Sequence, residues 1–271
     1  MKIAICFYGL VGSKIGKNGT GEQLDPNIAF EYYKKHLFDI NEDVDIFIHS
    51  WSVEAQDTLV KLYKPKSFIF EKQREFPESK NRKYINESLR YKITSLFYKI
   101  FNKSKYEKIK IENDKKCFRS FSRWYSSKQV LSLKKEYEKK NKFVYDTVMV
   151  TRLDIAFFRN LNFSEFDMKY FYASNRNIPP WKSLDGKASY EINKQELDTQ
   201  FFDLWFFSNS KYMDIFSLVF DNLHLYNEIS PHVCSKTHVD KYIGKEQIKY
   251  IFFRWFDHEL IRRKFYDKIE G

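Results

Sequence analysis

Short apolar runs alternate with polar, helix-forming stretches along the first quarter of the chain. Lys2–Tyr8, Val44–His49 and Lys66–Phe70 are each rich in apolar residues and bounded by polar ones, which predicts strands buried inside a sheet. Between the first two runs, Asp25 followed by Pro26 is the N-cap and first-turn signal of a helix. Strand, helix and strand at this spacing predict an α/β fold with a mostly parallel central sheet and flanking helices.

The clearest buried strand is Tyr145–Phe158, YDTVMVTRLDIAFF, which ends in charged residues. The two-residue period of a strand puts Arg152 and Asp154 on one face. The carboxyl ends of strands in an open α/β sheet are where such folds bind ligands, so this pair predicts a site. A structural ion pair that caps the strand is the alternative.

The ends of the first two strands carry further candidate groups. Five of the eight glycines lie between Gly9 and Gly21, where they permit positive φ and a close approach to a nucleotide or its phosphates. This stretch matches neither GxGxxG nor GxxxxGK[ST], and a surface loop is the alternative. Ser50 and Trp51 follow the second strand at the same rim. We interpret His49, which precedes them, as a hydrogen-bonded structural residue.

Two later stretches complete the candidate site. A helix is expected over Ser120–Asn141, and its first turns carry Ser126 toward the nucleotide side. Asp203 lies inside the aromatic run FFDLWFF, where an unpaired buried carboxylate costs several kcal/mol. Asp203 therefore requires a partner such as a metal, a base or a substrate hydroxyl. A final amphipathic helix is expected over Ile248–Ile269.

The charge of the chain is concentrated in one segment. Of the net +11, Lys61–Lys142 contributes 25 Lys and Arg against 9 Asp and Glu, an excess of +16, so the remainder sums to −5. An anionic partner, whether a phospholipid surface, a pyrophosphate-linked substrate or nucleic acid, is one explanation, and compositional drift is the other. Inside this basic segment, the apolar positions of residues 89–100 fit one helix face, which predicts either core packing or an interfacial helix. We expect no nucleic acid, because no recognition motif accompanies the charge.

The remaining composition narrows the class of protein. Cys6, Cys117 and Cys234 are odd in number and widely spaced, which argues against a disulfide framework and a zinc site. No signal-peptide pattern follows Met1, and no uncharged apolar run approaches the ~20 residues that span a bilayer. We expect a single α/β domain over residues 1–271, with a basic helical segment at about 71–142. We expect the protein to be cytoplasmic, and to bind the membrane periphery as well if the basic helix is interfacial.

Four motifs together resemble a known family. They are KIAICFYG, VDIFIHSW, a WYS-containing helix leading into YDTVMVTRLDIAF, and DLWFFSNSKYMD. These stretches resemble sugar-transferring enzymes of bacterial surface-polysaccharide clusters and large viruses. Those enzymes are taken to have the GT-A glycosyltransferase fold, a relative of the Rossmann fold. The resemblance implies a nucleotide-sugar donor, a glycan or glycolipid acceptor, and a divalent metal, Mn²⁺ or Mg²⁺, held on a DxD motif.

The implied roles carry over position by position. The nucleotide-sugar-binding residues would be Tyr8, Gly9, Ser50, Trp51, Ser126, Arg152 and Asp154. Asp154 matches the second carboxylate of DxD and would also hold the metal, and Asp203 matches the later acidic residue that acts as catalytic base in inverting members. Arg152 stands where the first carboxylate would be, which leaves metal dependence open, because a guanidinium itself binds phosphate.

Two other functions fit parts of the sequence. A non-catalytic basic module that binds nucleic acid or a membrane would use the charge of residues 61–142 alone. A metal nuclease would use Asp154 and Asp203, but the strand lacks an adjacent Glu-x-Lys element. The sequence therefore favours a nucleotide-sugar-dependent glycosyltransferase.

Overall fold

The computed structural model describes residues 1–12, 23–80, 82–84, 89–175, 199–253 and 256–261. Its strands are β1 (Ile3–Gly9), β2 (Val44–Ser50), β3 (Ser67–Phe70), β4 (Thr147–Arg152), β5 (Ile155–Phe157), β6 (Phe171–Asn175), β7 (Phe202–Ser208), β8 (Ile248–Phe253) and β9 (His258–Leu260). Its helices are α1 (Pro26–Tyr33), α2 (Gln56–Tyr63), α3 (Leu89–Phe101), α4 (Lys103–Asn141), α6 (Ser210–Ser217) and α7 (Pro231–Tyr242). A π-helical turn (Lys34–Phe38) extends α1, and short 3₁₀ turns lie at Val53–Ala55, Pro77–Ser79, Phe163–Glu165, Leu223–Leu225 and Lys245–Gln247.

The central sheet has the strand order β3-β2-β1-β4-β7-β6-β8. β1 pairs in parallel with β2 and β4, β2 with β3, and β6 with β8. β7 is antiparallel to both of its neighbours, β4 and β6. This arrangement confirms the predicted α/β fold with a mostly parallel sheet. The chain moves outward from β1 to β3 and then returns to the other side of β1 as β4, so the strand order reverses between β1 and β4, where open α/β sheets bind ligands.

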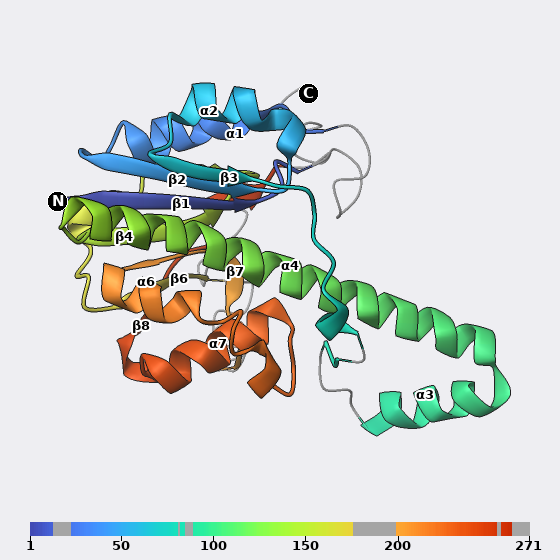
Figure 1. Ribbon diagram of the computed structural model, residues 1–271. Coiled ribbons are helices and arrows are strands. Elements are labelled where there is room, and N and C mark those ends of the chain that lie inside the picture. Colours follow the sequence, from blue (N-terminus) through green and yellow to red (C-terminus); the bar gives the residue numbers. More distant parts are fainter. Residues whose placement is uncertain (13–22, 81, 85–88, 176–198, 254–255, 262–271) are drawn as a thin grey trace.

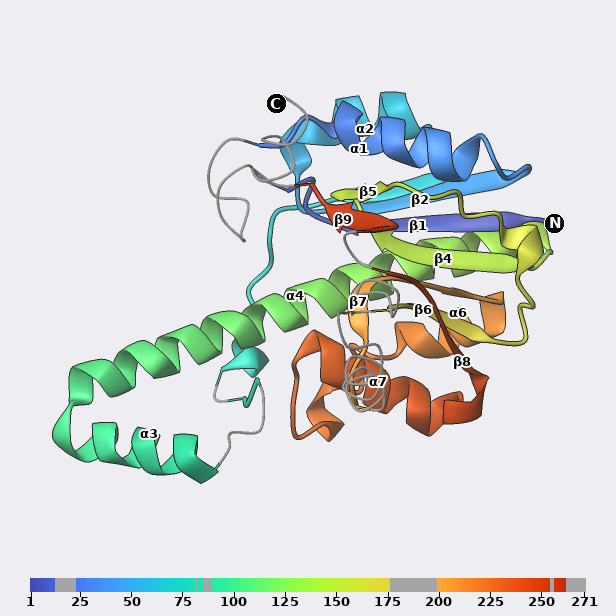
Figure 2. The ribbon, with the colours of Figure 1, turned by 180° about the vertical axis from the view of Figure 1, so that it is seen from behind.

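Alternate residues of β1 feed two separate cores, one on each face of the sheet. Ile5 and Phe7 belong to the cluster under α1 and α2, whereas Cys6 and Tyr8 belong to the cluster under α4, α6 and α7. Figures 1 and 2 show these two layers of helices on opposite faces of the sheet. Because side chains alternate with a period of two, Tyr8 at the end of β1 faces α4, and this fixes which helix supplies its partners.

The helix expected over Ser120–Asn141 begins earlier, at Lys103, and runs for 39 residues. At a rise of about 1.5 Å per residue it is about 58 Å long. Its C-terminal part is anchored by the fully buried Lys134, whose ammonium lies 3.0 Å from Glu138, 2.7 Å from Asp214 of α6 and 2.7 Å from the hydroxyl of Ser210. Its N-terminal part leaves the sheet and forms a projecting hairpin with α3 (Figure 1).

The local signal for the start of α1 is confirmed in the structure. The Asp25 carboxylate accepts a hydrogen bond of 2.9 Å from the backbone N–H of Asn27, and Pro26 occupies the first helical position. Asn209 caps α6 in the same way, accepting 2.9 Å from the backbone N–H of Tyr212. Both caps satisfy a donor that a helix N-terminus otherwise leaves without a partner.

Two predicted elements are wrong in the structure. Tyr145–Phe158 is not one strand, because the chain turns at Leu153 and Asp154 after β4 and continues as β5 in a second, two-stranded sheet with β9. The helix expected from Ile248 is instead β8, which joins the edge of the central sheet, followed by β9. In both places pairing with a distant strand outweighs the local pattern.

Candidate functional site

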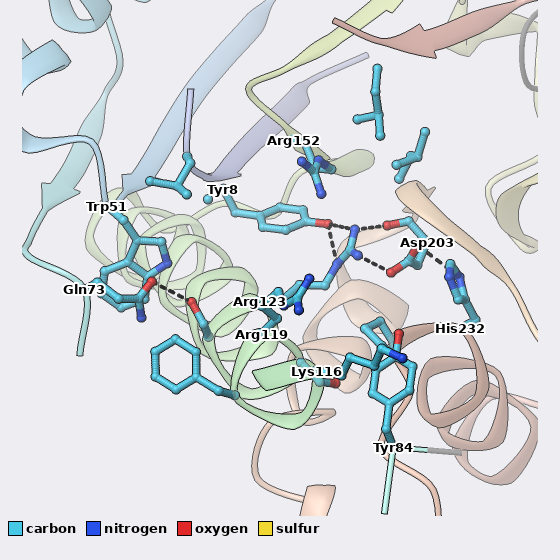
Figure 3. A pocket seen from close by; sticks show the side chains of 18 of the residues that line it. Tyr8, Trp51, Gln73, Tyr84, Lys116, Arg119, Arg123, Arg152, Asp203 and His232 are labelled. Atoms are coloured by element: carbon cyan, nitrogen blue, oxygen red, sulfur yellow. Dashed lines mark hydrogen bonds and ion pairs between the residues drawn. The ribbon is translucent and has the colours of Figure 1, made fainter. Parts of the chain in front are cut away.

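A pocket with a volume of about 430 Å³ opens at the carboxyl ends of β1 and β4. In the register of the sheet, Tyr8 lies opposite Arg152, and both line this pocket. Its polar and aromatic lining comes from the sheet, from α4, from the start of α7 and from the segments that follow β2 and β3. Figure 3 shows these residues: Tyr8, Trp51, Gln73, Tyr84, Lys116, Arg119, Arg123, Arg152, Asp203 and His232. The pocket therefore lies where the strand order reverses.

Gly9 ends β1 with a φ of +96°, a conformation that favours glycine. Its backbone N–H donates 2.9 Å to the hydroxyl of Ser126, and its carbonyl accepts 2.8 Å from the hydroxyl of Ser50. Neither serine is among the pocket-lining residues. The structure thus brings all three predicted residues together, with the serines behind the glycine, where they fix the wall of the pocket.

His49 lies in the same buried layer. Its Nδ1 is 2.7 Å from Ser126 Oγ and its Nε2 is 3.1 Å from a carboxylate oxygen of Glu71. Burial lowers the pKa of His49, although Glu71 opposes that shift. This agrees with the interpretation of a hydrogen-bonded structural histidine. Next along the chain, Trp51 lines the pocket and stacks on Tyr125 of α4, with ring centroids 5.6 Å apart.

Arg123 of α4 links the two sides of the pocket. Its guanidinium donates to the Tyr8 hydroxyl from Nε at 3.1 Å and from Nη2 at 2.8 Å, and it forms an ion pair with Asp203 of β7 (Figure 3). The side chains of Arg123 and Asp203 are 14% and 4% exposed. Burial alone would raise the pKa of Asp203, but Arg123 and then His232 hold it well below its usual range. Asp203 is therefore a buried, ionised carboxylate.

The partner on the other side of Asp203 is His232, at the start of α7. Its Nδ1 lies 3.0 Å from Asp203 Oδ1 and 3.0 Å from the carbonyl oxygen of Phe201. Either acceptor fixes the proton on Nδ1, which leaves Nε2 with its lone pair. The imidazole is 28% exposed and lines the pocket, and among the described residues nothing hydrogen-bonds Nε2. Asp203 and His232 form a carboxylate–imidazole dyad.

Arg152 and Asp154 also meet, as a bidentate ion pair. Arg152 donates from Nε and from Nη2 to the two oxygens of Asp154, each at 2.6 Å, across the turn that follows β4. Burial alone would lower the pKa of Arg152, but Asp154 outweighs it and the pKa is raised. Arg152 lines the pocket, whereas the Asp154 carboxylate, 3% exposed, lies behind it.

The expected metal does not fit this arrangement. Both oxygens of Asp154 are engaged by Arg152, and Asp203 is engaged by Arg123 and His232. Among the residues that the structure describes, no group of three His, Cys, Asp or Glu is placed to hold a metal ion. A divalent cation needs several oxygen or nitrogen ligands at one point, and here a guanidinium occupies the place of one.

Gly12 packs directly against this ion pair. It has a φ of +100°, and a Cβ added to it would lie 2.8 Å from Leu24 Cδ1 and 3.2 Å from Asp154 Cβ. We expect Gly12→Ala to lower the free energy of unfolding by about 2–4 kcal/mol, from backbone strain plus overpacking. Gly9→Ala is the matched control, since its φ is +96° but nothing lies within 4 Å of the added carbon, and about 1–2 kcal/mol is expected from strain alone. Urea denaturation measures both, and equal losses would contradict a packing role for Gly12.

Sequence reasoning missed Lys116 and Arg119, two of the cations that α4 brings to the pocket, although the first turns of the expected helix, with Arg123, were placed on the nucleotide side. Lys116, Arg119 and Arg123 all line it, and their spacing of three and seven residues puts them on one helix face. That spacing could have placed Lys116 and Arg119 at the site, but the helix was expected to begin only at Ser120, after both residues. No local pattern in the sequence pairs His232 with Asp203. The predicted residues Gly16, Gly19 and Gly21 lie outside the described part of the chain.

Comparisons with known proteins find a distant likeness among solved structures. No protein-family model matches the sequence, and no curated protein matches it. Among solved structures, the chain is similar to mouse xyloside xylosyltransferase 1 in its apo form, with a TM-score of 0.35 and 10% sequence identity over 92% of this chain and 84% of that one. Chains at such a TM-score need not share an activity, so the function is argued from the pocket itself.

Proposed function

We propose that the protein is a glycosyltransferase that takes a sugar from a nucleotide-diphosphate donor and transfers it to a hydroxyl of a glycan or glycolipid. The observation that carries the proposal is the composition of the pocket at the switch point between β1 and β4. It combines cations from α4 and β4, aromatic side chains, and an imidazole held by a buried carboxylate. The stretches that resemble sugar-transferring enzymes contribute Tyr8, Trp51, Arg152 and Asp203 to its lining.

The diphosphate of the donor is the group that the cations suit. Lys116 and Arg119 lie on the pocket side of α4, and Arg152 adds a third cation from the end of β4. Guanidinium groups form paired hydrogen bonds with phosphate oxygens, so Arg119 and Arg152 would orient the diphosphate as well as neutralise it. The leaving diphosphate gains charge as the glycosidic bond breaks, and preorganised cations stabilise that change.

The nucleoside would lie on the β1 and β2 side. Trp51 and Tyr8 provide aromatic surface there, and Gly9 leaves the backbone open for close approach, since nothing lies within 4 Å of the position of its missing Cβ. In this proposal Ser50 and Ser126 act through Gly9 and do not touch the donor.

Charge neutralisation in this proposal rests on the chain's own cations. Because both oxygens of Asp154 are held by Arg152, no step is assigned to a metal on that carboxylate. Asp154 instead fixes the orientation of the guanidinium that faces the pocket. The role expected of a metal on a DxD motif is thereby given to Arg152, with Asp154 as its positioning residue.

The proton of the acceptor is assigned to the dyad. The acceptor hydroxyl gives its proton to Nε2 of His232 as its oxygen bonds to the anomeric carbon, and the bonding pair of the broken C–O bond leaves with the diphosphate. Asp203, proposed from the sequence as the base, keeps the Nδ1 proton in place and stabilises the imidazolium that forms. The Asp203 carboxylate is paired on both oxygens, with Arg123 and with His232, whereas Nε2 of a neutral imidazole keeps a lone pair that can accept a proton.

A panel of nucleotide sugars tests the function. We expect one class of donor to raise the melting temperature and to release its nucleoside diphosphate when a glycan acceptor is present, with little difference between Mn²⁺ and EDTA. No stabilisation by any donor, with salt-sensitive binding of polyanions instead, would favour the non-catalytic basic module. A response that requires Mn²⁺ would return the metal to Asp154.

The cations on α4 should set donor affinity. We expect Lys116→Met with Arg119→Met to weaken donor binding by about 30-fold or more, because each removes a charge-assisted contact to the diphosphate. Lys128→Met with Lys135→Met is the matched control, since these lysines lie on the same helix but outside the pocket. Titration calorimetry with the identified donor compares the pairs. Equal affinity in the pocket variant and the control would remove the diphosphate from this part of the pocket.

A further inference from the structure

The projecting α3–α4 hairpin exposes a patch of large apolar side chains. Leu96, Phe97, Ile100 and Phe101 of α3 are 58%, 54%, 61% and 71% exposed, and the rings of Phe97 and Phe101 lie 4.8 Å apart. Their spacing puts them along one side of the helix. Core packing, one of the two roles expected for this helix face, is therefore wrong for Leu96, Phe97 and Ile100, because these side chains are exposed. An exposed apolar patch of this kind marks an interaction surface.

The same hairpin is strongly basic. Residues 89–112 carry seven Lys and Arg against two Glu, a net charge of +5. The exposed lysines of the hairpin are Lys99, Lys103, Lys105, Lys108 and Lys110. The ammonium of Lys105 lies 4.8 Å from the ring centre of Tyr98, which joins the first turn of α4 to the last turns of α3. The hairpin that carries these apolar and cationic residues projects well away from the sheet (Figures 1 and 2).

Three kinds of partner can be compared by their chemistry. A second copy of this chain would bring two tips of charge +5 together, and their repulsion opposes that contact. Nucleic acid would satisfy the lysines but not aliphatic Leu96 and Ile100, which offer no stacking surface. An anionic bilayer accepts both kinds of group, because apolar side chains enter the acyl boundary while the lysines meet phosphates.

We infer that the α3–α4 hairpin docks the protein on the surface of an anionic phospholipid bilayer. Phe97, Ile100 and Phe101 insert at the interface, and the lysines of the first turns of α4 contact the headgroups. No described helix is both long and apolar enough to cross a membrane. This inference stands on the hairpin alone and does not depend on the proposed reaction.

The contact also orients the pocket relative to the membrane. α4 runs without interruption from Lys103 at the tip to Arg119 in the pocket wall. Sixteen residues of helix span about 24 Å, so the pocket lies that far along α4 from the docked tip. An acceptor attached to a membrane lipid through a headgroup and a few sugars would be within reach.

Vesicle sedimentation with the full chain tests the inference. We expect binding to vesicles of phosphatidylcholine with about 30% phosphatidylglycerol to exceed binding to pure phosphatidylcholine by at least about 20-fold, and to weaken as salt rises. Phe97→Asp with Phe101→Asp, and separately Lys103→Glu with Lys108→Glu, should each lower binding at least about tenfold.

Matched control variants test whether binding depends on the hairpin itself and not on total charge or on any exposed apolar residue. Lys35→Glu with Lys61→Glu makes the same change of charge in the α1 and α2 layer, on the other face of the sheet from α4. Val144→Asp replaces a residue that is 67% exposed and follows the C-terminal end of α4. Both should bind vesicles as the parent does, and circular dichroism should show every variant folded. Equal binding to neutral and anionic vesicles, or equal losses in control and hairpin variants, would overturn the inference. Two other results would overturn it, in each case if Phe97→Asp with Phe101→Asp leaves vesicle binding unchanged. One is a dimer in sedimentation equilibrium that this double variant abolishes. The other is binding to a single-stranded oligonucleotide that is tighter than binding to vesicles and that this double variant abolishes.

Discussion

Arg123→Met is expected to lower the free energy of unfolding by about 3–5 kcal/mol, because it leaves the buried charge of Asp203 without its main counter-ion. The same change removes both donors to the Tyr8 hydroxyl. Urea denaturation measures the loss. Arg119→Met is the control on the same helix, since the Arg119 guanidinium is 32% exposed and lies 3.5 Å from Glu112, and a change within about 0.5 kcal/mol is expected there.

The pH dependence of stability gives an independent check on this pair. The pKa of Asp203 is held well below the value of about 3.9 that an unfolded chain gives it, so its stabilising contribution is complete above about pH 4 and is lost as the pH falls further. Arg123→Met should flatten the stability curve in that acidic range. The double variant Arg123→Met with Asp203→Asn should recover part of the loss, because neither charge is then left alone. A double variant no more stable than Arg123→Met would contradict this explanation.

The predictable parts of the fold are those in which a local signal decides the structure. β1, β2 and β3 are short apolar runs in a parallel sheet, and the Asp25 cap starts α1 where the sequence indicates. The segment from Ile248 fails because its apolar spacing fits a helix as well as a strand. It becomes β8 by pairing with β6, in which Phe171 lies opposite Ile248, a partner 77 residues earlier that no local pattern reveals.

The candidate site divides in the same way. The meeting of Gly9, Ser50 and Arg152 at one rim follows from strand ends alone, since parallel strands share a carboxyl edge. The pairing of Arg123 with Asp203 was not predictable, because the residues are 80 positions apart and only the packing of α4 on the sheet brings them together. The buried carboxylate did signal that some partner must exist, and the structure supplies two.

His232→Gln is expected to lower the rate of sugar transfer by about 10²–10⁴-fold, because the acceptor proton then has no base to receive it. Glutamine keeps a polar side chain of similar size, so donor affinity should stay within about twofold and the melting temperature within about 3 °C. His224→Gln is the matched control: this histidine is exposed in a 3₁₀ turn away from the pocket, where its Nδ1 lies 2.7 Å from the carbonyl of Asp221. Release of nucleoside diphosphate under saturating donor compares the two variants.

Asp203→Asn separates the two members of the dyad. If His232 is the base and Asp203 holds its Nδ1 proton, the two variants should each be slow and their combination no slower than His232→Gln alone, because residues that act as one unit are not additive. Full activity in His232→Gln with loss in Asp203→Asn would return the role of base to the carboxylate. If His232→Gln weakens donor binding but leaves the rate at saturating donor unchanged, His232 would instead be one of the residues that hold the donor. Only an interaction made in the transition state changes the rate at saturation.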